Sequence, residues 1–266
     1  LLEDDFTQIS SGSSYSLEPA DVDNDGDLDV IGTNGVLKNN GTGIFSETSY
    51  APGIAVLLVK SGDLNGDGYV DLVVGDRNTN VRFGLNNGTG NFTSFEALET
   101  PTRTYFFEVA SLNNDDKMDI LLSHDVDNKV TILRQDDSGN FTSESLATDF
   151  QPTVTTSADF NNDGLTDFAV GTPPHAEESY VSLFLQRNSG DFQLALNPVI
   201  GTWAYGLAHG DLNNDGKIDI VGFSPNGPGI SIILNDFVSQ PTHVTTHIEI
   251  NALTSSSAWF ALSPGD

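Results

Sequence analysis

A nine-residue acidic segment occurs five times in this 266-residue chain and concentrates the side chains that bind hard cations. The copies read DVDNDGDLD, DLNGDGYVD, SLNNDDKMD, DFNNDGLTD and DLNNDGKID, and they span residues 21–29, 63–71, 111–119, 159–167 and 211–219. Calcium takes several oxygen ligands at about 2.3–2.6 Å, and side chains at alternate positions of a short loop can point inward together. Glycine at position 6 of four copies permits the positive φ of a sharp turn. Each segment therefore predicts a Ca²⁺ site.

The predicted ligands are the side chains at positions 1, 3, 5 and 9 of each segment and the main-chain carbonyl at position 7. An EF-hand is excluded because its closing Glu falls at position 12 and helices flank its loop. Magnesium fits less well because it keeps its waters in a near-ideal octahedron. The candidate ligand residues are Asp21, Asp23, Asp25, Asp27, Asp29, Asp63, Asn65, Asp67, Tyr69, Asp71, Ser111, Asn113, Asp115, Lys117, Asp119, Asp159, Asn161, Asp163, Leu165, Asp167, Asp211, Asn213, Asp215, Lys217 and Asp219.

The third segment departs from the pattern. Ser111 replaces the first Asp, and Asp116 stands where the other copies have Gly, so Asp115 and Asp119 are its only ligand carboxylates. Asp tolerates positive φ better than most residues, so we expect the turn to survive while the affinity for calcium falls. The sequence thus predicts four or five calcium ions, with weak or no binding at the third segment.

A competing interpretation needs no metal, because Asp, Asn and Gly also form polar turns. Five copies in one register favour the metal. Without counterions, so many close carboxylates would repel one another, which would raise their pKa values and destabilise the fold.

The composition excludes several classes of function. The chain has 10 Lys and Arg against 38 Asp and Glu, a net charge of −28, whereas binding to nucleic acid or to an anionic membrane needs clustered basic residues. No apolar run approaches the ~20 residues of a membrane-spanning helix. The absence of cysteine rules out disulfides, thiolate zinc sites and cysteine nucleophiles. No G-x-S-x-G, P-loop or H-E-x-x-H motif is present, so no catalytic residue is predicted.

Short apolar runs surround each acidic segment in a constant order. One run precedes the segment, and a β-branched run follows at once, for example Val70–Val74. A third run leads to a turn rich in Asn, Gly and Asp, and a fourth run starts at a Phe such as Phe45, Phe92, Phe141 or Phe192. Runs of this length between turn residues are typical of strands, and no long helical pattern interrupts them. Each repeat therefore predicts four antiparallel strands.

The repeat length indicates the architecture. The segments start 42 to 52 residues apart, which is the size of one four-stranded blade of a β-propeller. We expect residues 1–266 to form a single all-β propeller domain with five complete repeats. Phe6 with the residues after it, and Ala258–Leu262, are similar to a fourth and a first strand, so the two termini predict a partial sixth blade. A fragment of a seven-bladed propeller and a ring of five blades are the alternatives.

These repeats resemble the FG-GAP/VCBS type, which is the calcium-loop blade of integrin α-subunit propellers and of many bacterial surface proteins. The matching pieces are DLNGDGYVDLVVG (63–75), DFNNDGLTDFAVG (159–171), DLNNDGKIDIVGF (211–223) and the turn NNGTGNF (86–92). The resemblance implies calcium between the first and second strands of each blade. It also implies an extracellular location and a role in adhesion or in presenting a binding face, without naming a ligand.

The loops between second and third strands lie on the face opposite the acidic segments in such a blade, and their variable length favours that face for binding. They are residues 33–35, 76–80, 124–129, 172–179 and 224–229. Aromatic residues gather at the starts of first strands (Tyr105, Phe106, Phe107, Trp203, Tyr205, Trp259 and Phe260), where packing between blades competes with sugar binding as their role. The histidines (124, 175, 209, 243 and 247) are interpreted as structural or surface residues, and Asn40, Asn87, Asn91 and Asn140 begin glycosylation sequons.

Two functional hypotheses follow. The first is a non-enzymatic, calcium-stabilised extracellular propeller for adhesion, surface assembly or recognition of protein or glycan. Self-assembly and further domains of a longer parent chain stay open as partners. The second is a lectin-like or catalytic polysaccharide-active propeller, either a lyase or a hydrolase. A lyase acting on acidic glycans needs a basic cluster beside Tyr or His, and Arg103 near Tyr105 is the one suggestive pair.

Overall fold

The computed structural model describes residues 15–113, 115, 117–136, 138–172, 179–199, 204–223, 229–236 and 247–249. These residues form five antiparallel sheets of four strands each, and the described part of the chain contains no helix. The strands of the first three sheets are β1 (Leu17–Ala20), β2 (Asp29–Gly32), β3 (Gly35–Asn39) and β4 (Phe45–Ser49), then β5 (Leu58–Gly62), β6 (Asp71–Gly75), β7 (Val81–Gly84) and β8 (Glu96–Leu98), then β9 (Phe106–Ala110), β10 (Asp119–Ser123), β11 (Lys129–Gln135) and β12 (Phe141–Ala147). Those of the last two are β13 (Val154–Ala158), β14 (Asp167–Gly171), β15 (Val181–Gln186) and β16 (Phe192–Leu196), then β17 (Gly206–Gly210), β18 (Asp219–Phe223), β19 (Ile230–Ile233) and β20 (His247–Glu249).

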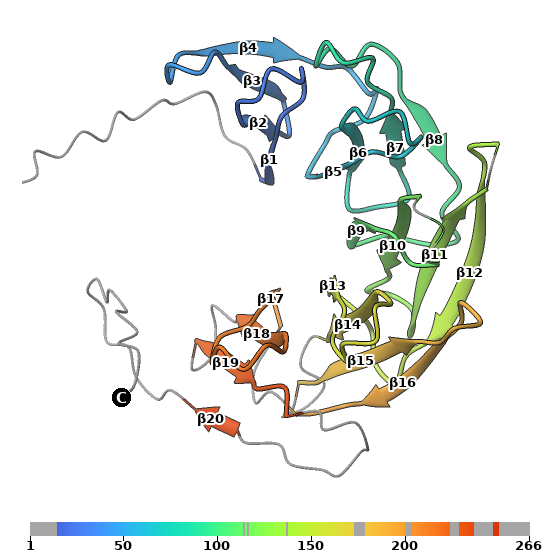
Figure 1. Ribbon diagram of the computed structural model, residues 1–266. Coiled ribbons are helices and arrows are strands. Elements are labelled where there is room, and N and C mark those ends of the chain that lie inside the picture. The colour runs from blue at the N-terminus through green and yellow to red at the C-terminus, as the bar shows by residue number, and fades with distance from the viewer. Residues whose placement is uncertain are drawn as a thin grey trace, which may run out of the picture.

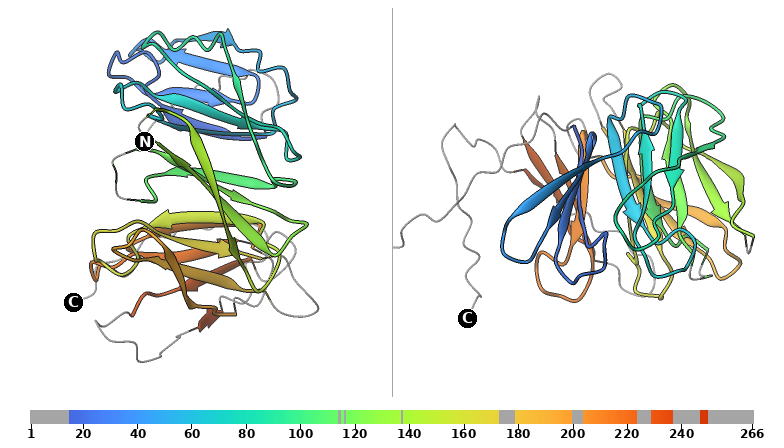
Figure 2. Two further views of the ribbon diagram at one scale, coloured as in Figure 1. Left: turned by 90° about the vertical axis from the view of Figure 1, so that its right-hand side faces the viewer. Right: turned by 90° about the horizontal axis from the view of Figure 1, so that it is seen from above.

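Each sheet is one blade of a β-propeller, which confirms the predicted fold. Figure 1 shows the blades side by side around a central axis, with β1, β5, β9, β13 and β17 innermost. These innermost strands contact one another in chain order, from β1 to β5 and on to β17. The side views of Figure 2 show neighbouring sheets stacked face to face.

The strands within each blade follow one another as a meander. Every acidic segment connects the first strand to the second, and its last Asp is the first residue of the second strand. Three fourth strands begin at the expected Phe (Phe45, Phe141 and Phe192). The second blade differs, because Phe92 is buried ahead of β8 and packs with Phe95 instead of starting the strand.

Four hydrophobic clusters join neighbouring blades and make up the core. In β6, Val73 packs toward the third blade, whereas Leu72 and Val74 pack toward the first. Every residue of β6, β10 and β14 is buried, because these second strands have a blade on either side. The first and fifth blades are less completely buried, since Leu17 of β1 is 62% exposed and Phe223 of β18 is 51% exposed.

The segments expected to form a partial sixth blade, around Phe6 and at Ala258–Leu262, lie outside the described residues. The same holds for Trp203, Trp259, Phe260, His175 and His243. In the described part of the chain no helix has the length and apolar character needed to cross a membrane.

Candidate metal centre

The Asp that closes each acidic segment is buried and holds its blade together. Asp29, Asp71, Asp119, Asp167 and Asp219 are all 0% exposed. One carboxylate oxygen accepts the main-chain N–H of position 2 in the segment, and the other accepts the N–H of the residue at or just beyond the end of the third strand. All ten distances lie between 2.7 and 3.0 Å. A single side chain therefore fixes the acidic segment against the third strand in every blade.

Burial acts on the protonation of these groups. Loss of water around Asp71 and Asp167 raises the pKa of each to about 6, although two main-chain N–H donors per carboxylate oppose the rise. Negative neighbours in the same segment add to it, since Asp67 and Asp63 lie near Asp71. The buried carboxylates thus lie in negative surroundings that a cation would relieve.

The first segment gathers its acidic side chains most closely. Asp21 accepts the main-chain N–H of Asp25 at 3.1 Å and that of Gly26 at 2.9 Å, which folds the segment around its own carboxylate. Asn24 and Gly26 have φ of 60° and 93°. As a result, one carboxylate oxygen each from Asp21, Asp23 and Asp29 lie within 4.8 Å of one another.

This arrangement fits a calcium ion. The donor set is entirely oxygen, the ligand type that calcium prefers. Oδ1 of Asp23 is buried and has no hydrogen-bond partner among the described residues, so it has an unused acceptor. Burial, then the charges of Asp29 and Asp25, raise the pKa of Asp23 despite the opposing charge of Lys38. These residues would hold the ion, which would neutralise their mutual repulsion and fix the connection between β1 and β2.

The second, fourth and fifth segments form the same turn with Asn at position 3. The Asp at position 1 accepts the N–H groups of positions 5 and 6, and the Asp at position 5 accepts that of position 7. Gly68, Gly164 and Gly216 have φ of 81° to 86°, as expected for glycine at position 6. Positions 1 and 5 therefore face the same turn in these three segments, while their role as metal ligands stays a prediction.

The third segment has Ser111 in place of the Asp around which the other segments turn, although the N–H of Lys117 still donates to Asp115 at 3.1 Å. Asn114 and Asp116 lie outside the described residues. Asp115 accepts the side-chain amide of Asn113 at 2.8 Å, and Asp119 keeps its two main-chain donors. The segment thus retains the buried closing Asp, but the first residue is Ser111, which brings no carboxylate.

Side chains from the next blade also bind the acidic segments, a feature that the sequence analysis missed. The side-chain amides of Asn86 and Asn235 donate to the position-2 carbonyls of Val22 and Phe160 at 2.7 and 2.6 Å. Gln186 donates to Leu112 in the same way. In these three segments position 2 is therefore bound at its N–H by its own blade and at its carbonyl by the next. The signal in the sequence was an Asn or Gln at the end of the third run.

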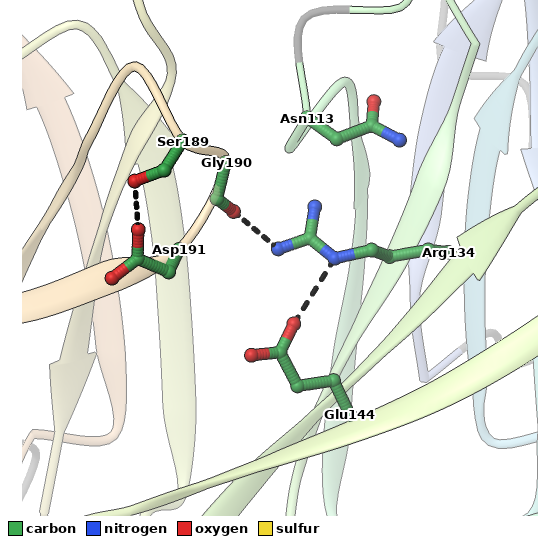
Figure 3. Close-up of a pocket in the computed structure, with 6 residues that line it drawn as sticks. All are labelled: Asn113, Arg134, Glu144, Ser189, Gly190 and Asp191. Carbon is green, nitrogen blue, oxygen red and sulfur yellow. Dashed lines mark hydrogen bonds and ion pairs between the residues drawn. The ribbon is translucent and has the colours of Figure 1, made fainter.

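Arg134 adds a cation to the junction of the third and fourth blades. Its guanidinium donates to the carbonyls of Leu112 at 2.9 Å and Gly190 at 2.7 Å, and to Glu144 at 3.1 Å. The group lies 5.8 Å from the ring of Phe192. Figure 3 shows Arg134 between Glu144 and Gly190. These residues line a polar pocket of about 390 Å³. Its hydrogen bonds tie it to the protein on three sides, which indicates a structural role.

The other candidate residues have mostly structural surroundings. Phe107 is 1% exposed and belongs to the core between the second and third blades, as the packing interpretation expected. His124 is buried, and His209 bonds to Thr156 at 2.7 Å. Tyr105 lies beneath the guanidinium of Arg77 at 5.2 Å. Residues 173–178 and 224–228 of the variable loops lie outside the described residues.

A family model named FG-GAP-like repeat matches residues 63–122, 112–170 and 159–222, which together span more than half of the chain. The chain belongs to the FG-GAP-like repeat family. Integrin alpha-8 of Gallus gallus is 38% identical over 100 residues, and that of Mus musculus is 39% identical over 95 residues. The matches cover 32% and 30% of this FG-GAP chain, but only 10% and 9% of the two integrin chains.

Two solved structures share the fold of this FG-GAP propeller. An Agrocybe aegerita lectin that recognises non-reducing terminal N-acetylglucosamine aligns with a TM-score of 0.57 at 20% identity, over 83% of this chain and 63% of the lectin. BBS1N, solved in complex with ARL6DN, aligns with a TM-score of 0.51 at 12% identity, over 79% of this chain and 61% of that chain. At these identities the likeness shows the fold alone.

Proposed function

We propose that this FG-GAP propeller is a non-enzymatic, extracellular binding module whose blades are stabilised by calcium in the acidic segments. The main support for calcium binding is the geometry of the first segment. Asp21, Asp23 and Asp29 bring three carboxylate oxygens within 4.8 Å of one another, and Asp23 Oδ1 has no hydrogen-bond partner among the described residues. The second, fourth and fifth segments supply further sites through their shared turn. In this proposal residues 1–266 form one domain.

Calcium would act on stability. Each acidic segment joins the first strand to the second, and the N–H of its position 2 donates to the closing Asp, as from Val22 to Asp29. In three segments the carbonyl of position 2 also accepts a side-chain amide of the next blade. An ion held there links the strand connection to the junction between blades. Binding free energy then adds to the free energy of unfolding by linkage. Short acidic loops suit the millimolar calcium found outside cells, which supports the extracellular location together with the integrin relatives.

Recognition of protein or glycan is the activity that we assign to the module. The integrin alpha-8 relatives support a binding function, and so does the lectin with the same fold. The lectin supports glycan as the second candidate ligand. Binding of the purified chain to an array of immobilised glycans would distinguish a glycan ligand from a protein ligand. Release of unsaturated or reducing sugar from a polysaccharide by the purified chain would contradict the non-enzymatic assignment.

The metal is tested by a thermal melt of the purified chain in excess EGTA and in millimolar calcium, with ions counted by native mass spectrometry. We expect a clear rise in the melting temperature with calcium and four or five ions per chain. An unchanged melting temperature with no bound ion would show that the segments are only polar turns. The matched control is magnesium at the same concentration, which should raise the melting temperature much less.

A further inference from the structure

We propose that Arg77, stacked on Tyr105 and braced by Arg103, forms a site for a side-chain carboxylate of a partner protein. Arg77 lies in the loop between β6 and β7, and Tyr105 lies just before β9, so both are at the ends of strands opposite the acidic segments. The inference rests on the proposed function as a binding propeller and names one place where it binds.

The backbone of Arg77 has an unusual conformation. Its φ is 55°, a region that non-glycine residues occupy rarely and at a cost in free energy. The carboxylate of Asp76 holds the loop in this shape, since it accepts the N–H groups of Asn78 and Asn80 at 2.9 and 3.3 Å and the side-chain amide of Asn80 at 2.6 Å. Asp76 is thereby occupied within the loop, although it is the nearest acid to Arg77 in sequence.

The guanidinium of Arg77 has an aromatic support and no recorded counter-ion. It lies 5.2 Å from the centre of the Tyr105 ring, a cation–π distance. Its Nε is buried without a hydrogen-bond partner, and no ion pair is recorded for it with any residue that the structure describes. Arg103, Arg134 and Arg187 each pair with a carboxylate. Arg82 also has a buried Nε without a partner, but among the described residues only Arg77 combines this feature with an aromatic ring beneath its guanidinium. In a chain with a net charge of −28, an unpaired guanidinium is conspicuous.

Arg103 and its neighbours make the site rigid. Arg103 Nε donates to the carbonyl of Arg77 at 3.3 Å, and its Nη2 lies 3.2 Å from Oδ2 of Asp125. The ring of buried His124 donates to the carbonyl of Arg103 at 2.9 Å. The N–H of Thr104 donates to the carbonyl of Asn78 at 2.7 Å. The loops of the second and third blades are therefore joined, and Arg77 is held between them before any ligand arrives.

The ligand chemistry follows from the guanidinium and its surroundings. A planar guanidinium with free N–H groups matches a carboxylate in a two-point hydrogen-bonded pair. The strongly negative chain would repel a polyanion, so we infer a single carboxylate on an otherwise uncharged or basic surface. Sugar sites are generally concave, and the polar pocket described above lies at Arg134, away from Arg77. Arg77 and Tyr105 are both half-buried, so the guanidinium keeps some contact with solvent and a projecting Asp or Glu of a protein can reach it.

The chain has five arginines, so the Nε–Hε region of a ¹⁵N NMR spectrum holds few signals and reports on Arg77 directly. The probe is the peptide acetyl-Gly-Asp-Gly-amide, titrated in saturating calcium, with acetyl-Gly-Asn-Gly-amide as its uncharged match. We expect a saturable shift of the Arg77 signal with the Asp peptide only. Arg77→Gln should weaken binding by about tenfold, the usual order for losing a charge-assisted pair. Arg187→Gln, an exposed arginine away from the site, should leave binding unchanged.

Three results would overturn the proposal. They are no shift with the Asp peptide, equal shifts with the Asn peptide, and tighter binding of sodium glucuronate, which would assign the site to an acidic sugar. If Arg77→Gln melts early, Arg77→Lys keeps the charge without the two-point fork and should still weaken binding. Failure of the calcium proposal shows separately, in the ion count and in the EGTA melt, because neither depends on the peptide.

Discussion

The first and third acidic segments share a buried closing Asp but differ in the charged groups around it. Both end in a buried Asp that accepts two main-chain N–H groups. The first adds Asp21 and Asp23, and its oxygens gather within 4.8 Å. The third begins with Ser111, and the guanidinium of Arg134 binds its Leu112 carbonyl instead. Under the proposed function, a metal ion would hold the first strand connection of the first blade, whereas the guanidinium of Arg134 holds that of the third blade.

Lys38 in the first blade corresponds to Arg134 in the third. Each precedes the residue that donates to the closing Asp, and each reaches a carbonyl in the third-to-fourth turn of the next blade, at Thr89 and Gly190. The other blades have leucine at this place: Leu85, Leu185 and Leu234. Lys38 Nζ also lies 3.9 Å from Oδ2 of Asp23, so in the first blade the side-chain cation stands beside the expected metal ligands.

The largest effect is expected from the part that both segments share. Asp119→Asn puts an amide N–H against a buried main-chain N–H, and we expect a loss of about 3 kcal/mol in the free energy of unfolding. The loss should be the same in calcium and in EGTA. Asp29→Asn should lose more in calcium than in EGTA, because it also removes a metal ligand. Chemical denaturation in both buffers measures these losses. If calcium changes the loss equally in the two variants, the first and third segments do not differ in metal binding.

Substitutions of the carboxylates at positions 3 and 5 should distinguish the first segment, where we expect a metal ion, from the third, where we do not. Asp23→Ala removes a ligand of the first site, so we expect one ion fewer and a melting temperature several degrees lower in calcium but not in EGTA. A site at a hundredfold excess over its dissociation constant contributes about 2.7 kcal/mol. Asp115→Ala in the third segment should change neither the ion count nor the effect of calcium. A lost ion in Asp115→Ala would show that the third segment binds metal after all.

The sequence predicted the propeller, its strands and its acidic connections, because these depend on local patterns repeated five times. It could not show that Asp29 and its counterparts are buried under two main-chain donors, since position 9 of a loop looks the same whether it faces a metal or the interior. It also missed Asn86, Gln186 and Asn235, whose partners lie 64 to 75 residues away. Such contacts depend on how blades stack, which no single repeat encodes.

Arg134 should matter regardless of calcium. Burial raises the pKa of Asp119, and the charge of Arg134 opposes that rise. Arg134→Gln removes this charge and breaks the bonds to Leu112 and Gly190. We expect a loss of about 1–3 kcal/mol, equal in calcium and in EGTA. Arg187→Gln is the matched control, because that ion pair with Asp191 is exposed and should contribute little. A loss that disappears in EGTA would mean that Arg134 acts through a bound ion.

The smallest and most specific effect is expected at Lys38. Its ammonium group lies beside Asp23, so it competes with calcium for the same negative charge, and Lys38→Met should strengthen calcium binding at the first segment by a fewfold. The same change removes the bond to Thr89, so stability in EGTA should fall slightly. Isothermal titration with calcium tests the affinity, and chemical denaturation in EGTA tests the stability, with Arg134→Gln as the comparison in both. If Lys38 acts only as a tie between blades, as Arg134 does, calcium affinity will not rise, and the first and third blades will differ in their carboxylates alone.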